Sequence, residues 1–242
     1  NWPSMIINYN NTIKKSEKKQ REDIQKSIRD LDDIVRNVRA YFKRIKQRNR
    51  MADERQKVDL RLESMIPYVI EKKSIYIHAN EARQIQSAIK WANQNNLKII
   101  IVGGDPNSIN SEIIYKSLKK INKSIKKIIY IIINYDLFLK QLKKLKYSLK
   151  IAKVDNINDY LNDSRLKILD ININSKKIFN IDSKVASKYV LNSLNYAHSL
   201  GNRNDVKGII NCPLDKNLLN QSQIGVTEYL ARKNKIKKDS EV

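Results

Sequence analysis

The stretch "KIIIVGGDPNSINSEIIYKSLKKI", residues 98–121, decides the fold class of this chain. A short apolar run ends in two glycines, Asp and Pro, and apolar residues at helical spacing follow after a few polar ones. An apolar run of this length is typical of a buried strand, and glycine and proline mark a turn after it. The stretch therefore predicts a strand, a turn and a helix, which is the repeating unit of α/β proteins.

The same alternation continues on both sides of this stretch. Upstream, "SIYIHAN" predicts a strand and "EARQIQSAIKWANQNN" a helix that Asn80 caps. Downstream, strands are predicted in "KKIIYIII", "LKIAKV", "LKILDI" and "VKGIINC", and helices over about 110–121, over 135–146 and in "DSKVASKYVLNSLNYAHSLG". Short helices are expected at Pro213 and at Gly225. Because short links join strand, helix and strand, the sequence predicts an α/β fold with a mostly parallel sheet and flanking helices.

A long amphipathic helix is predicted ahead of this α/β pattern. Between Asp23 and Arg48 the apolar residues follow one another at spacings of four and three, sustained for three heptads. A dimerising coiled coil and a helix lying on its own domain are both compatible with this pattern, and three heptads favour the second. The stretch "VDLRLESMIPYVIEK" then predicts a second helix, which Pro67 breaks or shifts.

Length and cysteine content limit the class of protein. The chain has 242 residues, a single cysteine (Cys212) and no uninterrupted apolar run long enough to cross a membrane. The N-terminal residues show none of the features of a signal peptide. We therefore expect a cytoplasmic protein without disulfides and without a membrane segment.

The charge is strongly positive, with 48 Lys and Arg against 25 Asp and Glu, a net charge of +23. Such an excess can attract nucleic acid or anionic lipid. The cations are dispersed along a chain rich in Lys, Asn and Ile, and no aromatic stacking residues alternate with them, so we do not expect nucleic acid as the main partner. Residues 1–97 contain 10 Arg and 11 Lys, whereas residues 98–242 contain 3 Arg and 24 Lys. This shift predicts two segments with a boundary near residue 98.

Four residues are candidates for a functional site. Asp105 follows two glycines beyond the end of a strand, where open α/β sheets bind ligands, although a purely structural turn explains the pattern equally well. Lys216 is suited to bind a phosphate, and Thr227 either donates its hydroxyl to a ligand or caps a helix. His78 lies at a strand end, where a metal ligand or base is placed in barrel enzymes. With only two histidines, the chain cannot complete a His-rich metal centre.

Residues from about 99 to 233 resemble the N-terminal half of 4-hydroxythreonine-4-phosphate dehydrogenase, an oxidoreductase of pyridoxal phosphate biosynthesis. "GDPNSINSEI" is similar to the family's G-[DE]-P-A-G-I-G-P-E opening, and "VKGIINCPLDKNLLN" followed by "IGVTEYLA" is similar to its strand, P-[IV]-x-K helix and G-H-T-E-F segment. The resemblance implies two α/β/α domains, a dimer, a small phosphorylated substrate, NAD as hydride acceptor and a divalent metal held by histidines. It implies substrate contacts for Thr227, Lys216 and Asp105.

The chain also differs from this family at positions that matter for substrate, metal and cofactor binding. Val226 stands where the family has the histidine of its substrate-binding His-Thr pair, so only Thr227 corresponds. The family's metal-binding histidines and its cofactor-binding portion have no counterpart in this chain. We therefore expect a partial dehydrogenase of vitamin B6 biosynthesis that is inactive alone.

Residues from about 20 to 104 resemble a different family. "IPYVIEKKSIYIHANEARQIQSAIKWANQNNLKIIIVGG" is similar to a P-V-x-x-H-A strand, a helix and a strand ending in Gly-Gly of imidazolonepropionase-like amidohydrolases, which are metal-dependent barrels. This resemblance places His78 at a metal-ligand position. It makes residues 1–97 an amidohydrolase-like fragment with the long helix and residues 98–242 the dehydrogenase-like domain, joined as a fusion of two partial genes. The alternatives to the dehydrogenase are a metal-dependent amidohydrolase fragment and a non-enzymatic basic binding or assembly module.

Overall fold

The computed structural model of the protein describes residues 4–8, 17–51, 58–71, 74–95, 98–159, 164–203, 206, 208–219 and 225–233. Within these ranges a seven-stranded sheet forms the centre of the molecule, in the order β1-β2-β7-β3-β4-β6-β5. The strands are β1 (Ser4–Asn8), β2 (Ser74–His78), β3 (Ile99–Val102), β4 (Ile129–Ile133), β5 (Ile151–Val154), β6 (Leu166–Asp170) and β7 (Gly208–Asn211). Every neighbouring pair is parallel, which confirms the predicted fold class.

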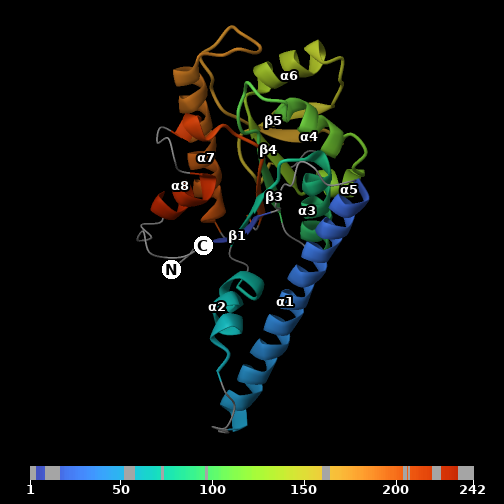
Figure 1. The fold of residues 1–242 in the computed structure, drawn as a ribbon, viewed down its shortest axis with the longest axis vertical. Helices are drawn as coiled ribbons and strands as arrows, with labels where there is room; N and C mark the ends of the chain where they lie inside the picture. The colour runs from blue at the N-terminus through green and yellow to red at the C-terminus, as the bar shows by residue number, and fades with distance from the viewer. Residues whose placement is uncertain are drawn as a thin grey trace.

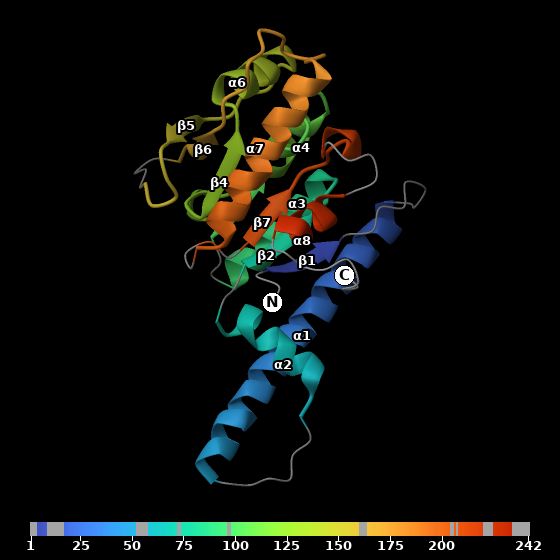
Figure 2. The ribbon, with the colours of Figure 1, turned by 90° about the vertical axis from the view of Figure 1, so that its left-hand side faces the viewer.

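Helices cover both faces of the sheet (Figures 1 and 2). They are α1 (Glu17–Met51), α2 (Leu60–Val69), α3 (Ala82–Gln94), α4 (Asn110–Leu118), α5 (Lys123–Lys126), α6 (Tyr135–Lys144), α7 (Ser183–Gly201), the 3-10 helix η1 (Lys216–Leu219) and α8 (Val226–Lys233). Buried residues of α1, α3, α4 and α6 form one apolar cluster with one face of the strands, and those of α7, η1 and α8 form another with the opposite face. The core therefore consists of two layers, as expected for a parallel sheet covered on both faces. No described helix has both the length and the hydropathy that crossing a membrane requires.

The long N-terminal helix is confirmed as α1. Leu31 and Val35 pack against the sheet's core, and Trp91 Nε1 donates a hydrogen bond of 2.8 Å to Asp32 Oδ1. Beyond these contacts α1 continues together with α2 as a pair of helices that projects from the body (Figure 1). The second helix, α2, continues through Pro67 to Val69 and is not broken there, because a proline near the end of a helix removes only one backbone donor.

Two helix starts differ from the sequence prediction. The helix expected at or just after Pro213 is the 3-10 helix η1, which begins only at Lys216; Asp215 Oδ1 accepts a hydrogen bond of 2.9 Å from the backbone N–H of Asn217 at its start. Asn80 is not the cap of α3, because Glu81 occupies that position. The side chain of Gln84 accepts hydrogen bonds from the backbone N–H groups of both Asn80 and Glu81, which moves the start of the helix by one residue.

Strands of both predicted segments belong to this one sheet. β2, from residues 1–97, pairs along its length with β7, from residues 98–242, and β7 also pairs with β3. The chain returns to the middle of the sheet through α7, which packs across the strands between β6 and β7 (Figure 2). The carboxyl ends of β2, β7 and β3 therefore lie next to one another at one edge, although they are far apart in the sequence.

One lysine of β6 is buried in the sheet. Lys167 is 5% exposed; its Nζ donates a hydrogen bond to the backbone oxygen of Lys127 and lies 4.1 Å from the centre of the Tyr130 ring. Burial, followed by the charge of Lys98, lowers the pKa of Lys167 from its ordinary 10.5 to about 8. The ammonium form is thus disfavoured in the folded protein.

This pKa predicts a pH dependence of stability that Lys167→Met removes. Between about pH 8 and about pH 10.5 the unfolded chain keeps the lysine proton while the folded chain has lost it, so the free energy of unfolding of the wild type rises with pH across this window. The variant lacks this rise. Urea denaturation of both proteins at closely spaced pH values measures it, and parallel curves for the two proteins would contradict the lowered pKa.

Candidate functional site

The candidate site lies at the carboxyl edge of the sheet, where β2, β7 and β3 end side by side. In the strand register His78 of β2 is opposite Asn211 of β7, and Asn211 is opposite Val102 of β3. The loop Gly103 to Asn110 follows β3, and the loop that leads to η1 follows β7. Helix α4 continues from β3 on one face of the sheet, whereas η1 packs on the other face. Such a position, where the chain leaves adjacent strands toward opposite faces, is where open α/β sheets bind ligands.

The two glycines that follow β3 allow close packing between protein segments. Gly104 has φ +69°, a conformation that glycine adopts without strain, and a Cβ at this position would lie 2.5 Å from the backbone oxygen of Pro213. A Cβ on Gly103 would lie 2.9 Å from the side chain of Ile133. The space beside both glycines is therefore filled by protein. The sequence left open whether this is a ligand-binding loop or a structural turn, and for Gly103 and Gly104 the close packing is that of a structural turn.

Asn110 joins the loop after β3 to the loop after β7. It lies at the start of α4 and is 2% exposed. Its Nδ2 donates hydrogen bonds to the backbone oxygens of Gly103 (2.8 Å), Asp105 (3.3 Å) and Pro213 (2.6 Å). Asp105 N also donates to Pro213 O at 3.3 Å. The two sequence segments that carry the dehydrogenase resemblance are thus held together by one side-chain amide.

Two buried amide oxygens at this edge have no hydrogen-bond partner among the described residues. They are Oδ1 of Asn110 and Oδ1 of Asn211. An unpaired buried acceptor costs about 1 to 3 kcal/mol, so such atoms are usually satisfied by water or by a ligand. Both oxygens are suited to accept hydrogen bonds from N–H or O–H groups. Sequence reasoning missed both residues; the only signal was an asparagine at the end of a buried strand and another at a helix start.

His78 and Lys216 lie close enough for their charges to interact. Burial, followed by the charge of Lys216, lowers the pKa of His78, so the imidazole is neutral at pH 7. Its Nδ1 is 3.5 Å from Nδ2 of Asn211. Within the part of the chain that the structure describes, no three His, Cys, Asp or Glu side chains are placed to hold a metal ion. A neighbouring lysine also repels a cation, so the surroundings of His78 do not fit a metal centre.

Asp105 belongs to the same edge but is engaged within its own loop. Its Oδ1 accepts a hydrogen bond of 2.8 Å from Asn107 N. The pKa of Asp105 is raised, first by burial and then by the charge of Asp215, while the Asn107 hydrogen bond opposes the shift. A carboxylate repels a phosphate, so the contact that suits Asp105 is one with a hydroxyl or an ammonium group.

Cys212 and Thr227 complete the set of residues near these loops. Cys212 is fully buried, and burial raises the pKa of its thiol to about 12, so it is no nucleophile at neutral pH. Helix α8 begins at Val226, which places Thr227 inside the first turn and not at the capping position. Leu230 of α8 packs in the same apolar cluster as Leu218 and Leu219 of η1. The helix that contains Thr227 is thereby packed beside the helix that begins at Lys216.

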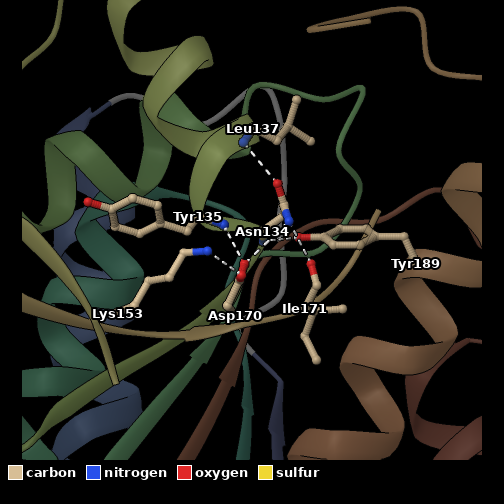
Figure 3. Close-up of polar contacts among 7 residues, drawn as sticks. All are labelled: Asn134, Tyr135, Leu137, Lys153, Asp170, Ile171 and Tyr189. Atoms are coloured by element: carbon tan, nitrogen blue, oxygen red, sulfur yellow. Dashed lines mark hydrogen bonds and ion pairs between the residues drawn. The ribbon is translucent and has the colours of Figure 1, made fainter. Parts of the chain in front are cut away.

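A second polar cluster, which the sequence did not predict, lies where β4, β6 and β5 end (Figure 3). Asp170 accepts hydrogen bonds from Tyr135 N (2.7 Å) and Asn134 Nδ2 (3.3 Å) and forms an ion pair with Lys153 Nζ (2.7 Å). The Asp170 hydrogen bond is the main cause that raises the pKa of Lys153. Asn134 also caps α6 through Leu137 N, and its own N–H donates to the Tyr189 hydroxyl. The polar groups of this cluster are hydrogen-bonded or ion-paired with one another, and these contacts connect the ends of β4, β6 and β5.

A cavity of about 680 Å³ lies away from this edge, between α1 and α2, with Tyr41, Asp59 and Leu62 among its lining residues. It contains none of the residues that the sequence nominated.

The chain was compared with protein-family models, curated proteins and solved structures, and only solved structures match it. Among solved structures, the fold is similar to a 4-hydroxythreonine-4-phosphate dehydrogenase from Burkholderia phymatum, with a TM-score of 0.51 and 19% sequence identity over 59% of this chain and 45% of that one. A 4-hydroxythreonine-4-phosphate dehydrogenase from Klebsiella pneumoniae matches with a TM-score of 0.48 and 17% identity, over 56% of this chain and 45% of that one. This chain thus spans less than half the length of each of these two dehydrogenases.

Proposed function

We propose that the chain is an α/β domain of the 4-hydroxythreonine-4-phosphate dehydrogenase type that retains part of a substrate site. The observation that supports this best is the Asn110 amide, which bonds to both Gly103 O and Pro213 O. It joins the two segments in which the sequence resembles that family, and it does so at the edge where such a sheet binds ligands. The fold similarity to the Burkholderia phymatum enzyme supports the same assignment.

In this proposal each nominated residue has a limited role. Lys216 provides a positive charge for the phosphate of the substrate, and the hydroxyl of Thr227 donates a further hydrogen bond. Asp105 shapes the loop after β3 through Asn107 N. The unpaired oxygens of Asn110 and Asn211 are buried and are suited to accept a hydrogen bond from an enclosed water.

The described residues do not supply the rest of the reaction. Enzymes of this type require NAD to accept a hydride and a divalent metal to polarise the alcohol. The residues around His78 do not fit a metal, and the space beside Gly103 and Gly104 is filled by protein. We therefore propose that the chain binds a phosphorylated substrate but does not oxidise it alone.

Calorimetric titration of the purified chain with 4-hydroxythreonine-4-phosphate tests the binding site. We expect wild-type binding, and Lys216→Ala to weaken it about tenfold, which corresponds to the loss of one charge-assisted contact of about 1.4 kcal/mol. Lys188→Ala is the matched control, because this lysine is exposed on α7, and it should bind like the wild type. Absence of wild-type binding at millimolar substrate, or equal effects of the two substitutions, would overturn the proposed site.

The predicted inactivity needs a separate assay of the same protein. With substrate, NAD and a divalent metal present, we expect no formation of NADH above the level of a heat-denatured sample. Metal-dependent NAD reduction that Lys216→Ala diminishes would show that the chain is a complete catalyst and would refute the partial-site proposal.

A further inference from the structure

The amino edge of the sheet, opposite the candidate site, presents a row of cations. Lys98, Arg165 and Lys150 each directly precede a strand: β3, β6 and β5, respectively. The first residues of the four neighbouring strands β3, β4, β6 and β5 are in register with one another, to within one residue. The three cations that precede β3, β6 and β5 therefore lie in one row across these strands. With neighbouring strands about 4.8 Å apart, the row extends over about 14 Å.

More lysines surround this row. The segment between α4 and β4 and the segment from the end of α6 to β5 both lead to the amino edge, and they contribute Lys119, Lys120, Lys123, Lys126, Lys127, Lys143, Lys144 and Lys146. Residues 119–150 contain ten lysines and a single acid, Asp136, so this stretch alone has a net charge of +9. Asp136 lies in the first turn of α6, near the opposite edge of the sheet.

Lys167, which lies beside this row, is not paired with an acid among the described residues. The first cause of its lowered pKa is burial, and the second is the positive charge of Lys98. The contacts of its ammonium group are a backbone oxygen and an aromatic ring, both uncharged. The described segments 98, 119–128, 143–150 and 164–167 of this edge contain no acid. The link from β5 to β6 brings Asp159 near it, since Lys98 Nζ donates a hydrogen bond of 3.4 Å to Oδ1 of the neighbouring Asn158.

A general abundance of lysine and the stabilisation of helix ends explain part of this pattern. Lysines in the last turn of a helix interact favourably with its dipole, which accounts for Lys143 and Lys144 of α6. Neither explanation places a cation directly before each of three strands. The sequence argued against nucleic acid because the cations are dispersed along the chain, whereas the fold gathers many of them at one edge.

We propose that the amino edge of the sheet, between β3 and β5, binds the phosphate backbone of a nucleic acid. Successive phosphates of one strand are about 3.4 Å apart along a duplex axis, so the row matches the length of about four of them. A membrane surface fits less well, because interfacial binding requires apolar anchors. Among the described residues, the exposed large apolar side chains are Ile34, Val58, Leu60, Ile109 and Leu139, and none belongs to this edge. The inference is independent of the proposed substrate site.

Fluorescence anisotropy of the full chain with labelled DNA and RNA duplexes of roughly 20 base pairs, at about 50 mM and about 200 mM salt, tests the proposal. The edge variant combines Lys120→Glu, Lys127→Glu and Lys150→Glu, all exposed. We expect it to bind at least tenfold more weakly than the wild type. Each phosphate contact adds about 0.9 to the slope of log affinity against log salt, so the loss of three should reduce the slope by about 2 to 3.

A matched control removes the same charge elsewhere. Lys176→Glu, Lys184→Glu and Lys188→Glu change the net charge equally at exposed positions that precede or begin α7, on the carboxyl side of the sheet. This variant should lose less than threefold in affinity, and thermal melts should show that both variants are folded. Equal losses of affinity in the two variants would show that binding depends only on the net charge of the protein, and would overturn the proposal that the amino edge is the binding site. Absence of wild-type binding at low salt, or binding only to phosphatidylserine vesicles, would overturn the proposal as well.

Discussion

Gly104→Ala should lower the free energy of unfolding by about 2 to 5 kcal/mol. An alanine at φ +69° costs about 1 to 2 kcal/mol, because its Cβ approaches the following carbonyl oxygen. The new methyl group would also meet Pro213 O at 2.5 Å, Asn110 Nδ2 at 2.6 Å and Cys212 O at 3.0 Å. Such overpacking costs typically about 1 to 3 kcal/mol, and here the contacts are mostly backbone atoms that cannot rotate away.

Gly208→Ala is the matched control for this substitution. Gly208 begins β7, the strand next to β3, and a Cβ there would lie 3.8 Å from Lys98 O, an ordinary van der Waals distance. Its free energy of unfolding should change by less than about 1 kcal/mol, since alanine is no worse than glycine inside a strand. Urea denaturation compares both variants with the wild type. A loss below about 1 kcal/mol for Gly104→Ala would mean that the loops after β3 and β7 are not in contact.

The sequence predicted six of the seven strands because each is a short, largely apolar segment within an alternation of strands and helices, which is typical of a parallel sheet covered on both faces. β1 (SMIIN) was missed, since it lies outside the alternation of strands and helices by which the other six were recognised. The order of the strands could not be predicted. The position of β7 between β2 and β3 depends on the path through α7 across the sheet, and a local pattern of residues contains no information on that path.

The candidate site was predictable only in part. The position of Asp105 beyond β3 and of Lys216 after β7 followed from the rule that ligands bind at the carboxyl ends of parallel strands. The buried amides of Asn110 and Asn211 were not predicted, because asparagine is mostly exposed and its burial follows from the packing of the two loops. The helix expected at or just after Pro213 begins only at Lys216, for a related reason. Pro213 O accepts a hydrogen bond from Asn110 of another segment, a contact that the local sequence does not reveal.

Asn110→Asp should be the most informative substitution at this site, with a loss of about 3 to 5 kcal/mol in the free energy of unfolding. The change replaces Nδ2 by an oxygen and keeps the size of the side chain. That oxygen would face the carbonyl oxygens of Gly103, Asp105 and Pro213, which Nδ2 contacts at 2.8, 3.3 and 2.6 Å. Three hydrogen bonds are lost at once, and an uncompensated charge is placed at a position that is 2% exposed.

The pH dependence of this loss separates the charge from the missing donor. Burial and the three carbonyl oxygens raise the pKa of the introduced carboxyl group above its unfolded value of about 3.9, so the folded state binds its proton more tightly. The variant's deficit should therefore be smallest below about pH 4, where both states are protonated, and grow as the pH rises through the folded pKa. Asn217→Asp, at an exposed position of η1, is the control and should cost less than about 0.5 kcal/mol at any of these pH values. A deficit for Asn110→Asp that does not change with pH would show that water reaches the introduced carboxylate, and the join between the two loops would then be an open surface contact.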